Sequence, residues 1–109
     1  MSIGPIIFAN ETARKHLIDE GEVVTFRRTE RTTGETWWQR SRTGPKQGEV
    51  TVEHVAEVDP SNASQLESYV TLSGFGSACE WQSAIETLGG GLEPGHLYRV
   101  RSLVDGDRA

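Results

Sequence analysis

Residues 50–58 read VTVEHVAEV, and this stretch decides the class of fold. Its even-numbered positions hold valine, valine, histidine, alanine and valine, whereas threonine and glutamate fill most of the positions between them. A period of two with one apolar side predicts a β-strand that is half buried in a sheet. His54 lies on the apolar side, and we interpret it as a hydrogen-bonded core residue rather than as a catalyst.

The segments around this strand predict the rest of the architecture. Strand-favouring residues predict further strands over 3–8, 23–29, 35–42 and 96–104. Capping residues and apolar stripes predict helices over 10–20, from about 62 to 74, and from 77 to about 88. Because the strands outnumber the helices and do not alternate with them, we expect an α+β fold. The expected architecture is a small, mainly antiparallel, barrel-like sheet with about three flanking helices.

Length and composition limit the kind of protein. The 109 residues fit one domain over 1–109, with a frayed tail at 105–109. Cys79 is the only cysteine, which excludes an internal disulfide and a zinc site built on cysteine pairs. We expect no metal site and no cofactor. We expect no secretory signal, and the sequence has no apolar run of about 18–20 residues, so we expect a cytoplasmic protein that does not enter membranes.

Positive charge gathers in one segment. Residues 27–46 hold six cations and two acids, a net charge of +4, whereas the whole chain carries −5 and the remainder therefore −9. Trp37 and Trp38 lie in the middle of this segment. Arginine offers a planar fork to phosphates and base edges, and an exposed indole ring stacks on bases. The candidate ligand contacts are Arg27, Arg28, Trp38, Arg40 and Arg42.

Each of these candidates has a purely structural alternative. Arg28 fits a rim position paired with Glu30 or Glu49, and Trp38 fits the edge of the barrel with arginine stems packed over it. Trp81 belongs to an apolar helical stripe and is expected in the core. Arg99 and Arg101 are expected to point to solvent and to pair with nearby acids.

The order of elements resembles the ASCH domain family of the PUA-like superfamily. That family has a Gly-x-Lys-x-x-x-x-Arg pattern, whose glycine and arginine correspond to Gly21 and Arg28, while Val23 occupies the lysine position. The stretches SGFGSACEW at 73–81 and LYRV at 97–100 are similar to the family as well. The resemblance implies a PUA-like pseudo-β-barrel that binds RNA, and it covers most of the chain.

Three functional hypotheses follow. The first is a module that binds RNA or a nucleotide-like ligand in a basic cleft containing tryptophan. The second is a small amidohydrolase that acts on a modified nucleoside, an activity of some proteins with a similar fold. It would use Thr25 and His54 with a nearby glutamate, because Val23 removes the lysine that those proteins use. The third is a protein-interaction module with Trp38 as its anchor.

Overall fold

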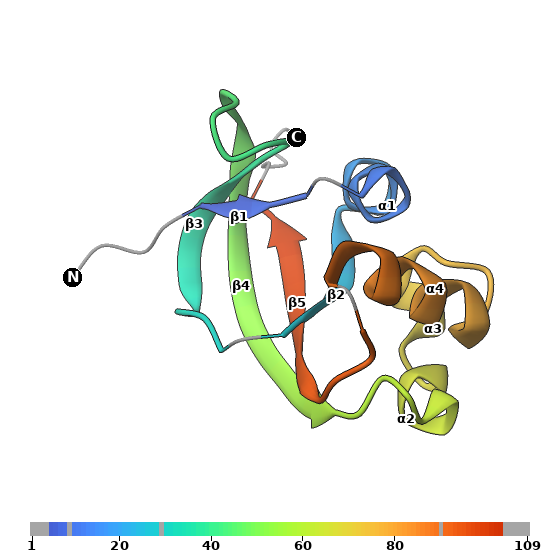
Figure 1. Ribbon diagram of the computed structural model, residues 1–109. Coiled ribbons are helices and arrows are strands. Elements are labelled where there is room, and N and C mark those ends of the chain that lie inside the picture. The colour runs from blue at the N-terminus through green and yellow to red at the C-terminus, as the bar shows by residue number, and fades with distance from the viewer. Residues whose placement is uncertain (1–4, 9, 29, 90, 104–109) are drawn as a thin grey trace.

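A curled sheet of five strands forms the centre of the computed structural model (Figure 1). The structure describes residues 5–8, 10–28, 30–89 and 91–103, so the predicted tail at 105–109 and the start of the first predicted strand lie outside the described residues. The strands are β1 (Ile6–Ile7), β2 (Glu22–Arg27), β3 (Gly34–Gln39), β4 (Lys46–Val58) and β5 (Gly95–Ser102). Their order across the sheet is β1-β3-β4-β5-β2.

Three of the four strand pairings in the described sheet are antiparallel, and β1 pairs with β3 in parallel. The sheet curls into a half-barrel whose two edge strands are β1 and β2 (Figure 1). The prediction of an α+β fold with a mainly antiparallel, barrel-like sheet is therefore confirmed at this level. β4 begins at Lys46, earlier than predicted, because the turn before it is tight: the Gly44 N–H donates to the Ser41 carbonyl at 3.1 Å.

Helix α1 (Glu11–Glu20) begins and ends at the residues that the sequence predicted. The Asn10 side-chain oxygen accepts a hydrogen bond from the Ala13 N–H at 3.0 Å, which satisfies one of the open donors at the start of the helix. Gly21 ends the helix with φ of 82° and donates its N–H to the Leu17 carbonyl at 2.9 Å. A side chain at this φ would be strained, so glycine is the natural residue here.

The remaining described helices are α2 (Ala63–Glu67), α3 (Val70–Ser73) and α4 (Ala78–Gly89). The single helix predicted from about 62 to 74 is wrong, because the chain bends at Tyr69, where φ is −112° and ψ is 0°. The bend lets both short helices turn apolar residues toward one cluster. The predicted start of α4 is confirmed: the Ser77 hydroxyl accepts the Glu80 N–H at 3.1 Å.

The sheet is buried on both sides by two apolar clusters. The inner cluster fills the curl beneath α1 and comprises Ile6, Phe8, Ala13, Leu17, Val23, Trp38, Val50, Val52, Tyr98 and Val100. The outer cluster lies between the sheet and α2–α4 and comprises Val24, Val58, Leu66, Ala78, Trp81, Ile85 and Leu97. β2 and β5 contribute to both clusters, because successive residues of a strand point to opposite sides. Trp81 is thus a buried residue, as predicted.

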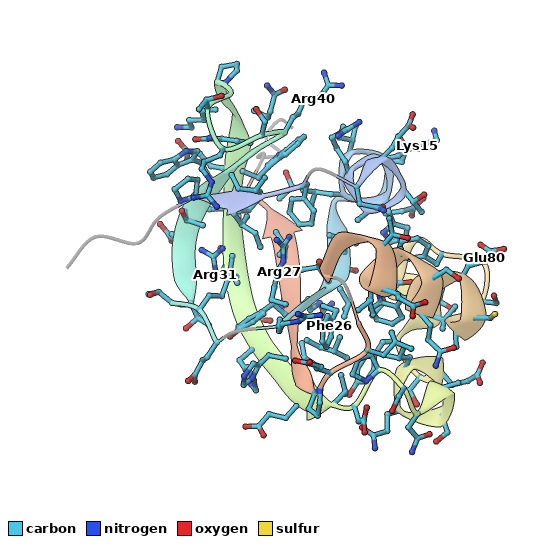
Figure 2. All side chains as sticks on the ribbon, viewed as in Figure 1. Lys15, Phe26, Arg27, Arg31, Arg40 and Glu80 are labelled. Atoms are coloured by element: carbon cyan, nitrogen blue, oxygen red, sulfur yellow. The ribbon has the colours of Figure 1, made fainter. Side chains whose placement is uncertain are left out.

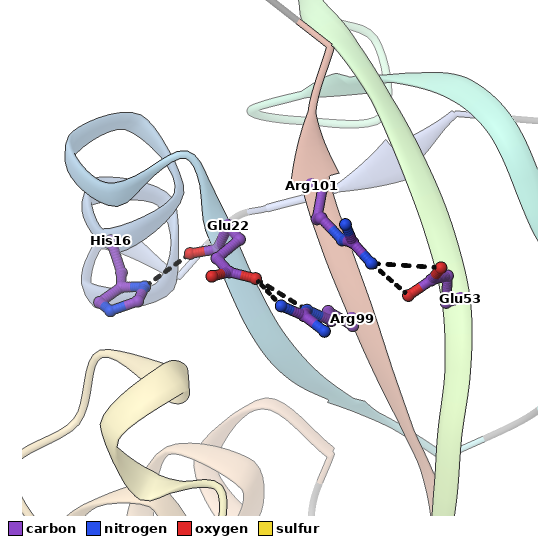
Figure 3. A network of polar contacts seen from close by, with 5 residues as sticks. All are labelled: His16, Glu22, Glu53, Arg99 and Arg101. Atoms are coloured by element: carbon purple, nitrogen blue, oxygen red, sulfur yellow. Dashed lines mark hydrogen bonds and ion pairs between the residues drawn. The ribbon is translucent and has the colours of Figure 1, made fainter.

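The outer side of the sheet also carries a polar network near α1 (Figure 3). Arg99 pairs with Glu22 at 2.7 Å, and Arg101 pairs with Glu53 at 3.3 Å. His16 places its Nδ1 2.8 Å from the Glu22 carbonyl oxygen. Both arginines are therefore neutralised by acids, as predicted, and neither joins a basic surface. None of the described helices combines the length and apolar character needed to cross a lipid bilayer.

Candidate functional site

A cavity of about 280 Å³ lies along the free edge of β2. Residues from both sides of this strand line it, which places the cavity where the half-barrel stays open between β2 and the end of β1. Most of the wall is apolar. It is formed by Ile7, Phe8, Asn10, Ala13, Val24, Thr25, Phe26, Arg27, Arg28, Phe75, Trp81, Ala84 and Ile85.

Arg27 is the main polar feature of this wall. Its Nη2 donates a hydrogen bond to the Ile7 carbonyl at 2.8 Å, and its guanidinium carbon lies 5.1 Å from the centre of the Phe8 ring. Because Ile7 belongs to β1 and Arg27 to β2, this contact connects the two edge strands of the half-barrel. The Nε of Arg27 is buried and has no hydrogen-bond partner.

The charge of Arg27 is held in an unfavourable environment. Burial lowers the pKa of Arg27 to about 10, and the nearby charge of Arg31 adds to the lowering. No carboxylate pairs with Arg27 in the part of the chain that the structure describes. A buried donor without an acceptor and a cation without a counter-charge are both costly, and an anionic ligand would relieve both.

Arg28 lies at the mouth of the same cavity. It is exposed, and its Nη2 donates to the Gly91 carbonyl at 3.0 Å. The rim pairing with Glu30 or Glu49 is absent among the described residues, since Glu49 pairs with Lys46 at 2.8 Å instead. Arg27 and Arg28 therefore bring two guanidinium groups to one cavity, although they point to opposite sides of the strand.

The other three candidate contacts lie elsewhere. Trp38 is 7% exposed and packs in the inner cluster, with its ring edge-on to Phe8 at a centroid distance of 6.1 Å. Arg40 and Arg42 are exposed in the segment between β3 and β4, and Figure 2 shows Arg40 far from Arg27. The structure thus does not bring the five candidates together, and Trp38 has no exposed ring to stack on a base or to anchor a protein partner.

Thr25 and His54, the two catalytic candidates, are also separated. Thr25 is 9% exposed and lines the cavity, but no basic side chain of the described residues forms a hydrogen bond with its hydroxyl. His54 lies across the sheet, with Tyr98 of β5 in register between it and Thr25. A hydroxyl needs a base within hydrogen-bond reach to become a nucleophile, so this geometry gives no support to the hydrolase hypothesis.

The interpretation of His54 as a core residue is wrong. The register between β4 and β5 shifts between His54 and Ala56, which is a β-bulge, and the burial pattern predicted by strict alternation ends there. His54 is exposed, and its Nε2 lies 3.1 Å from Nδ1 of His96.

Several residues of the site were not singled out from the sequence. Trp81, Ala84 and Ile85 were assigned to a core stripe, and this stripe is also one wall of the cavity. Phe75 stacks on Trp81, with ring planes 13° apart and centroids 6.4 Å apart. Phe75 and Trp81 were therefore a usable sequence signal for the cavity, but only with knowledge of where α4 packs.

The described residues contain no group of three or more side chains suited to holding a metal ion. Comparison of the chain with known protein families, with curated proteins and with solved structures gives no match. The geometry of the cavity and the charges around it are therefore the features that point to a function.

Proposed function

We propose that the protein binds a nucleotide, free or as an unpaired nucleotide of an RNA, in the cavity along β2. The base would occupy the apolar part, and the phosphate would lie near Arg27 and Arg28. The observation that carries this proposal is Arg27: a half-buried residue in an apolar wall, without a carboxylate partner among the described residues and with a buried, unused Nε–H.

The size and lining of the cavity support a small ligand with a flat apolar part. A volume of about 280 Å³ is close to the lower end of the about 300–1,000 Å³ typical of ligand pockets. Phenylalanine and tryptophan side chains in the wall provide aromatic surface, which suits a base. The fork of an arginine donates two parallel hydrogen bonds to a phosphate or a base edge.

The charge balance of the chain supports recognition at one site over general coating of RNA. A net charge of −5 repels a polyanion, so the composition does not provide the excess of positive charge that general RNA binding requires. Two guanidinium groups at one cavity act over a short range, where the rest of the acidic chain matters less. The half-barrel, with α1 over the inner cluster and α2–α4 against the outer cluster, is compatible with a small pseudo-barrel, and we propose that it is a PUA-like fold of the ASCH type.

NMR titration with nucleoside monophosphates and short single-stranded RNA at low salt tests this function. We expect the largest shifts in the side chains of Arg27, Trp81 and Ala84, since all three residues line the cavity. Ala84→Phe places a ring in the cavity and should weaken binding at least about tenfold, or about 1.4 kcal/mol.

Thr87→Phe is the matched control, because Thr87 lies on the same helix but is exposed and does not line the cavity. It should bind as the wild type does. The proposal fails if no ligand shifts the cavity signals, or if the shifts gather around Arg40 and Arg42 instead.

A further inference from the structure

We propose that the inner side of the half-barrel carries a second binding site, for a tetrahedral oxyanion such as phosphate or sulfate. Its ligating side chains are Arg27, Arg31, His54 and His96, which we call the basic cluster. The site is distinct from the apolar cavity, it touches the cavity only through Arg27, and its existence does not depend on what the cavity binds.

Strand register brings the basic cluster together around Tyr98. Arg27 of β2 lies opposite His96 of β5, and His54 of β4 lies opposite Tyr98 of β5. Directly opposite residues share one side of a sheet, so these four side chains stand on the inner side. The ring of Tyr98 lies 5.3 Å from that of His54 and 6.2 Å from that of His96, centre to centre.

Arg31 reaches the same place from the segment between β2 and β3. Its backbone N–H donates to the buried Tyr98 hydroxyl at 2.7 Å, and its Nε donates to the Thr32 carbonyl at 3.1 Å. Figure 2 shows Arg31 and Arg27 in the mouth of the curled sheet. Burial lowers the pKa of Arg31, as it does that of Arg27, and the charge of Arg31 in turn acts on Arg27. Two partly desolvated cations therefore lie close to each other.

The two histidines add ring nitrogens to the basic cluster. The Nε2 of His54 and the Nδ1 of His96 are 3.1 Å apart, a hydrogen bond in which one nitrogen must accept and therefore carries no proton. An oxyanion placed beside the pair can accept hydrogen bonds from the ring N–H groups. The other ionisable groups around the pair include Arg27, Arg31, Tyr98 and Glu57, together with Asp59, which lines a pocket with His96.

Glu57 is the acid that the register brings nearest to the basic cluster, opposite His96. It is exposed and forms no ion pair with any described residue. The cluster therefore places the Arg31 guanidinium and two imidazoles beside Arg27, and the described residues of β4 bring no ion pair into it. N–H groups carried by three strands and a loop on one side of the sheet suit a tetrahedral oxyanion, which accepts hydrogen bonds from several directions.

Sulfate is the probe, because its charge is −2 at neutral pH, and calorimetry with the wild-type chain gives its affinity. The double variant His54→Leu with His96→Leu should weaken binding about tenfold or more, because it removes both imidazoles. Arg31→Gln should weaken binding about tenfold or more, as expected for the loss of a charged hydrogen bond.

Arg101→Gln is the matched control, since Arg101 lies on the outer side of the sheet and pairs with Glu53. It should leave sulfate affinity unchanged, and Glu57→Gln should raise it. The inference is overturned if sulfate fails to bind, or if Arg31→Gln and Arg101→Gln weaken it equally, which would indicate a general charge effect. Ala84→Phe separates the two proposals, because it should block nucleotides in the cavity and leave sulfate binding intact.

Discussion

Replacement of Arg27 by methionine tests whether this half-buried arginine serves the fold or a ligand. The lowering of its pKa from the ordinary arginine value to about 10 corresponds to about 3 kcal/mol that the folded state loses by holding the charge. Solvent at the half-buried residue reduces this figure. Methionine keeps the length and apolar stem of the side chain and removes the charge.

Two favourable contacts oppose that penalty. The charged hydrogen bond to the Ile7 carbonyl contributes about 1.5–3 kcal/mol. The position of the guanidinium over the Phe8 ring contributes about 0.5–2 kcal/mol. Because the terms nearly cancel, we expect Arg27→Met to change the free energy of unfolding by less than about 1.5 kcal/mol in either direction, while nucleotide and sulfate binding fall at least about tenfold.

The direction of the Arg27 pKa shift determines the pH at which the wild type and Arg27→Met should be compared. Folding lowers the pKa of Arg27, so the unfolded chain binds this proton more tightly than the folded one. The penalty is therefore present in full at neutral pH, and it is relieved only as the pH rises above about 10. Urea unfolding at pH 7, followed by tryptophan fluorescence, measures the complete effect.

Arg14→Met is the matched control for this experiment. Arg14 also donates to a backbone carbonyl, that of Phe8 at 3.2 Å, but it does not line the cavity. Its replacement should leave ligand binding unchanged. A loss of more than about 3 kcal/mol in Arg27→Met, with ligand binding retained, would refute the reasoning and make Arg27 a structural connection between β1 and β2.

Two further substitutions test the packing around the site. Tyr98→Phe removes the acceptor of the Arg31 N–H and should lower the free energy of unfolding by about 1–3 kcal/mol in urea; an unchanged midpoint would contradict the hydrogen bond. Gly95→Ala would place a methyl carbon 2.5 Å from the Phe26 ring and should cost about 1–3 kcal/mol by overpacking. Gly91→Ala, whose added carbon has no neighbour nearer than 3.9 Å, should melt as the wild type does, and equal melting of both glycine variants would show that the close approach is absent.

The parts of the fold that depend on local chemistry could be predicted from the sequence. Asn10 and Gly21 set the ends of α1 through hydrogen bonds to residues no more than four positions away. The alternation of buried and less buried residues in β4 from Val50 to Val52 could also be predicted, because it depends only on the sequence of that strand. The bulge near His54 depends on how β4 pairs with β5, and the local sequence pattern of β4 does not predict it.

The site was harder to predict because it forms where both sides of β2 are covered. The alternation of side chains along β2 predicts that Arg27 and Arg28 point to opposite sides. It does not predict which side holds a ligand when both sides are buried. The structure places both arginines at one cavity, because the cavity follows the edge of the strand. Trp38 was counted with the arginines by its position in the sequence, whereas the packing of Phe8 and the neighbouring Gly48 encloses it.

The position of β5 has a consequence for the synthesis of this protein. β5 follows every other described strand in the sequence, yet it lies between β4 and β2 in the sheet, and β2 has no other strand partner in the described sheet. A chain emerging from the ribosome therefore exposes β2 with unpaired backbone groups until the last strand has been made. Such late, long-range pairing slows folding and leaves strand edges open to aggregation, so chaperone demand should be greatest just before β5 emerges.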